Sequence, residues 1–268
     1  MPASRSPSRT LKRPEPIRLK WPMIIIGLLG VTGIALLVLP ASLAARFLPP
    51  QIQAEDFSGT LWHGSAGKLT TFGRDAGACE WHIHPWSLLS LALSADVHWV
   101  RASAVVDATL QIDRQGYRAH NIHGSAALQD LRDLGVPSGW RGTATLRVNS
   151  LTGDFDKVTS IDGTVDLSGL ASTGIAAGAD LGNYQIRFAP DAASHEGEFT
   201  ASIADQGGPL ELRAQAHYSP ATHTGLLSGT LKERPEAGAS LHDQVQALTQ
   251  LRPRDTSGRI PVELEFTL

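Results

Sequence analysis

Apolar and polar residues alternate along much of the chain after Asp56, and this period of two constrains the fold more than any other feature of the sequence. In residues 106–112, apolar side chains occupy every second position and polar side chains the positions between. The same alternation recurs in four further segments, 143–148, 183–188, 210–217 and 260–268. Successive side chains of a strand point to opposite faces, so the pattern predicts strands with one apolar and one wet face. Such strands are typical of antiparallel sheets and not of the doubly covered sheets of α/β enzymes.

Two short segments with a helical pattern interrupt the predicted strands. Residues 85–91 begin with Pro85, which suits the first turn of a helix. Residues 241–251 carry an apolar stripe at helical spacing, with Ser240 expected at the N-cap. We therefore predict a mainly β fold: a curved antiparallel sheet, half-pipe or sandwich-like, with one or two short helices.

An uncharged run of 19 residues, from Trp21 to Leu39, precedes the predicted sheet. As a helix rising about 1.5 Å per residue it would extend roughly 28 Å, close to the thickness of the hydrocarbon core of a bilayer. Six basic residues and one acidic residue lie in the first 20 positions, whereas the acidic residues Glu55 and Asp56 follow the run. The positive-inside rule then predicts a single transmembrane helix with a cytoplasmic N-terminus and the sheet on the far side of the membrane.

A cleaved secretory signal is the alternative for this region, because Ser42 and Ala44 provide small residues after an apolar stretch. The run is longer than the core of a usual signal, about 7–15 residues, and this favours an uncleaved anchor. We therefore expect three parts: a basic cytoplasmic tail (1–20), a transmembrane helix with its exit (21–45) and one periplasmic β domain (46–268).

Charge and cysteine content exclude several classes of protein. Residues 21–268 carry 17 basic and 25 acidic side chains, so we expect no nucleic-acid partner. The single cysteine, Cys79, excludes an intramolecular disulfide framework and a zinc site made of cysteines alone. The sequence contains no P-loop, dinucleotide fingerprint or Gly-x-Ser-x-Gly element between a strand and a helix. We predict no catalytic residue and no cofactor.

Histidines are the residues most suggestive of a metal site, and six of them lie between positions 63 and 123. They are His63, His82, His84, His98, His120 and His123. His82 and His84, two apart in a strand, would share a face, and a third histidine nearby would complete a site. No HExxH motif and no carboxylate-bearing counterpart accompanies them, so we interpret them as exposed histidines and predict no metal ligand.

Tryptophan is also concentrated here, in a region of 38 residues that holds Trp62, Trp81, Trp86 and Trp99. Tryptophan is frequent both in cores and in interaction surfaces. We expect Trp81 and Trp99 in the core and, because they lie beside turns, Trp62 and Trp86 on a contact surface. The closing strand is a second candidate contact, because an unpaired edge can accept a partner strand. Its candidate residues are Ile260, Val262, Leu264 and Phe266.

Two motifs are present in this region. Gly59, Thr60, Trp62 and Gly64 form a Gly-Thr-x-Trp-x-Gly element, and Trp81, Pro85, Leu88 and Leu89 form a Trp-x-x-x-Pro-x-x-Leu-Leu element. Both elements resemble motifs of the protein N family of the bacterial type II secretion system. The resemblance extends to the C-terminal helix, a basic turn and the closing strand, whereas residues 113–220 match only in their alternation. Related patterns are familiar from periplasmic lipid-handling proteins of the AsmA-like group.

The resemblance implies a non-enzymatic accessory component of the type II machine in a Gram-negative cell. Family members are anchored in the cell inner membrane and expose a β domain to the periplasm, where the secretin or the inner-membrane platform would be the partner. The alternative function is an AsmA-like module whose apolar face shields phospholipid chains. A metal-dependent envelope hydrolase has the least support, because no nucleophile, base or water-excluding pocket is evident.

Overall fold

The computed structural model describes most of the chain after the predicted span. The described residues are 38–47, 52–132, 136–155, 157–175, 178–193, 198–219, 222 and 224–267. The predicted cytoplasmic tail and residues 21–37 of the predicted span lie outside them. Within the described ranges, no helix is both long enough and apolar enough to cross a bilayer. Residues from Pro40 onward form one compact unit.

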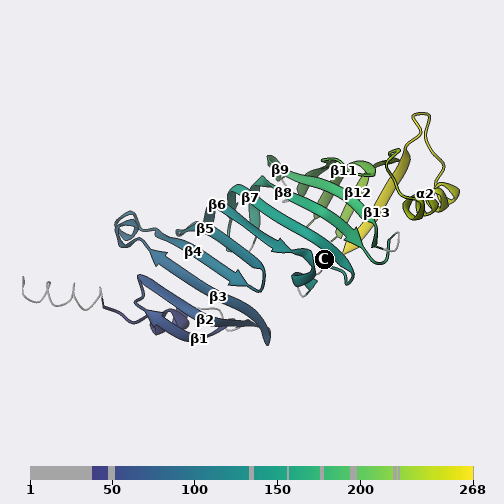
Figure 1. Cartoon of the computed structure of the whole chain (residues 1–268). Helices are drawn as coiled ribbons and strands as arrows, with labels where there is room; N and C mark the ends of the chain where they lie inside the picture. Colours follow the sequence, from purple (N-terminus) through teal and green to yellow (C-terminus); the bar gives the residue numbers. More distant parts are fainter. Residues whose placement is uncertain are drawn as a thin grey trace, which may run out of the picture. The chain divides into compact units, whose positions relative to one another are not determined.

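Thirteen strands form one open antiparallel sheet (Figure 1). The strands are β1 (Ile52–Gly59), β2 (His63–Thr71), β3 (Arg74–Ile83), β4 (Leu93–Arg101), β5 (Ala104–Ile112), β6 (Tyr117–Ala127), β7 (Trp140–Gly153), β8 (Val158–Ser172), β9 (Asp180–Ala193), β10 (Phe199–Asp205), β11 (Leu210–Ser219), β12 (Thr224–Glu233) and β13 (Ile260–Thr267). Their order in the sheet is their order in the chain, so β1 and β13 are its two edges. The predicted mainly β, antiparallel fold is confirmed.

Short helices accompany the sheet, and those that the described residues bound completely are the 3-10 helices η1 (Ala41–Phe47), η2 (Pro85–Ser90) and η3 (Leu128–Asp130) and the α-helix α2 (Ala239–Leu251). Both predicted helical segments are therefore present, with Pro85 in the first turn of η2. The predicted N-cap of α2 is wrong. Gly238 occupies that position with an extended backbone, no side chain caps the helix, and Ser240 already lies inside it.

The register of the strands sorts their side chains into two faces. Leu146, Val165 and Ile186 are neighbours across β7, β8 and β9. Their sequence neighbours Arg147 and Thr164 point to the opposite side. We call these two sides the apolar face and the polar face.

Helix α2 packs against apolar side chains of β9, β11 and β13, and Figure 1 shows it beside β13. Leu241 and Val245 of α2 are each 2% exposed and pack in one cluster with Ile260 of β13. The other buried members of this cluster are Leu181, Tyr184 and Leu210. The apolar stripe of the helix is therefore buried in a cluster that reaches back to Trp140 of β7, and this burial is what fixes α2 to the sheet.

Candidate functional site

The first family motif forms the tight turn between β1 and β2. Gly59 has a φ of 81°, and a Cβ at this position would lie 2.4 Å from the carbonyl oxygen of His63. The Thr60 N–H donates a hydrogen bond to that carbonyl (2.7 Å), and the His63 N–H donates to Thr60 Oγ1 (3.1 Å). The backbone of this turn therefore requires glycine at position 59, and the hydroxyl of Thr60 stabilises it by accepting a backbone hydrogen bond.

Trp81 of β3 lies across Gly64 of β2, and this contact joins the two motifs. The two residues are register partners, and a Cβ on Gly64 would meet the indole ring at 2.6 Å. The indole N–H donates to the carbonyl of Leu61 (2.9 Å), and the ring of Phe57 meets the indole edge-on with centroids 6.3 Å apart. Trp81 is therefore a fixed, half-buried side chain on the apolar face. Trp99 is similar, since its N–H donates to the carbonyl of Ala76 (2.7 Å).

The second motif forms η2, the connection between β3 and β4. Pro85 begins this helix, and Ser87 fastens it to the sheet: its hydroxyl donates to the carbonyl of His84 (2.6 Å) and accepts from the N–H of Ser94 (3.0 Å). The connection ends at Leu91, whose φ is 56°. These bonds leave the turn with a defined backbone.

The side chains of this turn are turned outward. Trp86 and Leu89 are each 81% exposed, Leu91 is 68% exposed and Leu88 is 45% exposed. Trp62, the other tryptophan predicted to contact a partner, is half-buried. The structure thus exposes only one of the two predicted contact tryptophans among the described residues, and it adds three leucines. Sequence reasoning placed two of these leucines in a motif and missed their exposure.

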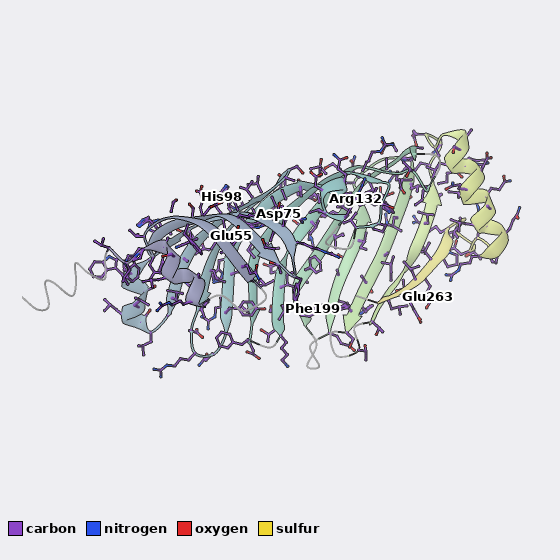
Figure 2. The ribbon with its side chains drawn as sticks, turned by 90° about the horizontal axis from the view of Figure 1, so that it is seen from below. Glu55, Asp75, His98, Arg132, Phe199 and Glu263 are labelled. Atoms are coloured by element: carbon purple, nitrogen blue, oxygen red, sulfur yellow. The ribbon has the colours of Figure 1, made fainter. Side chains whose placement is uncertain are left out.

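Strand β13 is an edge of the sheet, as expected, but its candidate contact residues differ in exposure. Ile260 is 2% exposed because it packs under α2, so its predicted role as a contact is corrected to a role in the core. Val262 is half-buried, and Leu264 is 56% exposed. The backbone of Phe266 pairs with Gly225, and its side chain lies outside the described part of the structure. Figure 2 labels Glu263 on this strand, close to α2.

The edge at β1 is partly covered. Pro40 forms an isolated bridge with Thr60, and η1 packs next to this edge, against β1 and β2. Ala41, the first residue of η1, is 2% exposed. The two edges of the sheet therefore differ: η1 lies against β1, whereas the side chain of Arg252, the residue that follows α2, bonds to the carbonyl of Glu263 in β13.

Histidines and carboxylates alternate on the polar face of the first strands, where Figure 2 labels His98. The rings of His63 and His82 have centroids 3.7 Å apart. His84 Nε2 lies 2.9 Å from Asp96 Oδ2. His98 Nδ1 lies 2.6 Å from Asp107 Oδ1, and His123 Nε2 lies 3.6 Å from the other oxygen of this carboxylate. The prediction that the histidines lack carboxylate partners is wrong, because each carboxylate comes from the neighbouring strand.

These pairs do not form a metal site or a catalytic constellation. Within the described ranges, no group of three or more His, Cys, Asp or Glu side chains is arranged to hold a metal ion. Ser65 lies two residues after His63, but its hydroxyl is hydrogen-bonded to the hydroxyl of Ser58 (2.8 Å). The hydroxyl of Thr109, which donates to Asp96 (2.8 Å), lowers the pKa of that carboxyl, and His84 adds to the effect.

Burial raises the pKa of the Cys79 thiol, which favours its unreactive protonated form.

A cavity of about 350 Å³ lies on the apolar face beneath α2. Apolar side chains dominate its lining, which includes Trp140, Leu167, Ile186, Ile203, Leu212 and Leu248. The Tyr184 hydroxyl donates to the carbonyl of Leu181 (2.6 Å), and burial raises the pKa of Tyr184 to about 12. The exposed residues Gln244 and Leu248 lie on the solvent side of the cavity. No local sequence pattern predicts this cavity, because its lining comes from six strands, one connecting segment and the helix.

Comparison with known proteins identifies the family. The family model described as "Type II secretion system (T2SS), protein N" matches residues 50–263, which is most of the chain. The type II secretion system protein N of Aeromonas hydrophila is 26% identical over 262 residues, covering 89% of this chain and 94% of that protein. No solved structure matches. The chain belongs to the protein N family of the type II secretion system and is a non-enzymatic component of protein secretion.

Proposed function

We propose that this chain is a single-pass accessory protein of the inner membrane that uses the free edge of β13 to contact the secretin or the inner-membrane platform. The observation that carries the proposal is that β13 is an edge strand whose backbone pairs with β12 on one side only, whereas the other edge strand, β1, is contacted by η1. An unpaired strand offers its backbone N–H and C=O groups to a partner strand. The N-terminal apolar run supplies the anchor, with the tail in the cytoplasm and the sheet in the periplasm.

The middle of β13 supports this proposal. Arg252 Nη2 lies 3.3 Å from the carbonyl oxygen of Glu263 and donates to it. Because the N–H and C=O of one strand residue point the same way in an antiparallel sheet, the N–H of Glu263 also points to the free side. Pro261 lies two residues earlier, so its missing N–H falls on the free side as well, as is usual for proline in an edge strand.

A pair of substitutions at Glu263 tests the proposal in the full-length protein. Glu263→Pro removes the outward N–H without removing a hydrogen bond to β12, so capture of secretin or platform subunits after mild crosslinking should fall strongly. Glu263→Ala keeps the N–H and should capture them as the unchanged protein does. Deletion of residues 259–268 is a poorer test, because it removes Ile260 from the core. Equal capture by both variants, with circular dichroism unchanged, would falsify the role of this edge.

The cavity beneath α2 favours a second candidate function, the handling of a phospholipid. Its lining offers little for a polar ligand, because the Tyr184 hydroxyl is already bonded to Leu181. A peptide in this space would leave backbone groups without partners, whereas an acyl chain would not. Mass spectrometry of organic extracts from the purified protein should then detect lipid at a stoichiometric level. Ile203→Phe, which fills the cavity, should lower that level, and Ala204→Phe on the polar face should not; an empty protein excludes this candidate.

A further inference from the structure

The turn formed by residues 86–91 concentrates exposed apolar surface. Of the nine large apolar side chains that are exposed among the described residues, four lie in this turn. They are Trp86, Leu88, Leu89 and Leu91. The sequence from Pro85 to Ala95 contains no charged residue. Such a surface is costly to leave in water and indicates that something covers it.

Several polar groups of the turn are bonded within it or to the residues that flank it. The Ser90 hydroxyl donates to the carbonyl of Ser87 (2.7 Å), and the Ser87 hydroxyl is bonded to His84 and Ser94. The N–H groups of Leu91 and Ala92 donate to carbonyls of the same turn. A segment whose polar groups are paired internally can enter an apolar layer without leaving unpaired donors there. It offers few directional groups for recognition by a protein.

The turn lies at the same end of the strands as Pro40, the first residue of the compact unit that contains the sheet. Pro40, the residue directly after the apolar run Trp21–Leu39, bridges Thr60 in the β1–β2 turn. That turn is joined to the start of η2, because the N–H of Ile83 donates to the carbonyl of Trp62 (2.7 Å). Adjacent strands are about 4.8 Å apart, so β1 and η2 are separated by roughly 10–15 Å.

We propose that Trp86, Leu88, Leu89 and Leu91 insert into the interfacial layer of the bilayer that holds the predicted span. This inference rests on the proposed anchoring. Tryptophan prefers this layer, where its ring is buried and its N–H remains near water. Insertion of one turn is weak by itself, but the span keeps the turn at the membrane surface and makes the second attachment effectively intramolecular. The insertion would hold the β1 end of the sheet at the membrane.

Phe72 provides a matched control. It is 80% exposed, nearly the same as Leu89, and it lies in the β2–β3 turn at the opposite end of the strands. In the full-length protein with Cys79→Ser, Leu89→Cys and Phe72→Cys are labelled separately with an environment-sensitive dye. Both proteins are reconstituted in vesicles of phosphatidylethanolamine and phosphatidylglycerol, with and without lipids that carry a doxyl quencher below the headgroup. We expect blue-shifted, quenched emission from the label at position 89 and water-like, unquenched emission from the label at position 72.

The outcomes separate the insertion from the anchor on which it rests. If the protein does not float with the vesicles, the anchor fails and the insertion fails with it. If it floats but the label at position 89 remains as water-like as the label at position 72, the anchor holds and the insertion is refuted. A blue shift at position 89 only after addition of secretin or platform subunits would also refute it, and would assign the turn to a protein partner.

Discussion

The two ends of the apolar face are stabilised in different ways. Near β13, helix α2 covers the strands, and Leu241, Val245 and Ile260 are each 2% exposed. Near β1, the buried apolar residues of β2, β4 and β5 are the alanines Ala66, Ala95 and Ala104. There the indoles of Trp81 and Trp99 lie on the sheet with their N–H groups bonded to backbone carbonyls.

The difference shows two solutions to the same problem, which is to shield one apolar side of an open sheet. A helix brings many side chains from one distant segment, and its removal affects several strands at once. A tryptophan shields a similar area from within the sheet, and it needs space such as that provided by Gly64. The first solution makes the β13 end dependent on nonlocal packing, and the second makes the β1 end dependent on its two motifs.

The largest effect is expected at the helix. Leu241→Ala should destabilise the protein by about 2–5 kcal/mol, because it removes a buried side chain and enlarges the cavity beneath α2. Hydrogen exchange should show lost protection in β9 to β13 while β1 to β5 remain protected. Leu248→Ala, at a 45% exposed position of the same helix, is the control and should cost less than about 1 kcal/mol. Equal loss of hydrogen-exchange protection in β1 to β5 and in β9 to β13 would show that the two ends of the sheet do not unfold independently.

At the other end, Gly64→Ala is expected to cost about 1–3 kcal/mol, because the new methyl group would overlap the indole of Trp81. Near-UV circular dichroism and tryptophan fluorescence should report the displaced ring, and chemical denaturation the loss of stability. Gly174→Ala adds a methyl group that would lie 3.8 Å from the Ser172 hydroxyl, an ordinary contact distance, so its spectra should be unchanged. An undisturbed indole in Gly64→Ala would contradict the dependence of this end on its motifs.

Tyr184 gives the β13 end a distinctive dependence on alkaline pH. Its pKa is raised by burial to about 12 in the folded protein, compared with about 10 in an unfolded chain. Because the pKa is raised on folding, the contribution of Tyr184 to the free energy of unfolding is fully present below about pH 10 and is lost as the pH rises toward 12. Tyr184→Phe should lose about 1 kcal/mol at neutral pH with the bond to Leu181, and its stability should fall less steeply above pH 10. Parallel slopes for the two proteins in denaturation between pH 9 and about 11.5 would argue against this role.

The smallest effect is expected on the polar face near β1. The pKa of Asp96 is lowered chiefly by the hydroxyl of Thr109, so this carboxylate contributes stability above its unfolded pKa of about 3.9 that is lost as the pH falls through its folded value. Thr109→Val should raise the pKa of Asp96 toward its ordinary value and weaken this acid dependence. Because Asp96 is exposed, the change in stability at neutral pH should be under about 0.5 kcal/mol. Carboxyl titration by NMR measures the pKa directly, and an unchanged value would assign its shift to His84.

Sequence reasoning succeeded where the signal is local. The alternation in residues 106–112 and 210–217 depends only on the geometry of a strand, and both segments are strands. Pro85 begins η2 for an equally local reason. Ile260 has the same alternation as its neighbours, but its burial depends on where α2 packs, and a period of two contains no information about that.

The functional surfaces show the same limit. The pairs His84–Asp96 and His98–Asp107 join neighbouring strands, so they depend on a register that a single sequence does not specify. The exposure of Trp86 was predicted from its place beside a turn. The accompanying exposure of Leu89 and Leu91 was not, since leucine is more often buried.

The sequential order of the strands has a consequence for how this protein is made. Each strand from β2 onward finds a partner in the strand that precedes it, so the sheet can grow as the polypeptide emerges and no strand must wait for a distant one. The packing of α2 against β9 joins segments that are far apart in the chain. A nascent molecule would carry a growing unpaired edge until β13 is complete, and that period is when aggregation or premature capture by another chain is most probable.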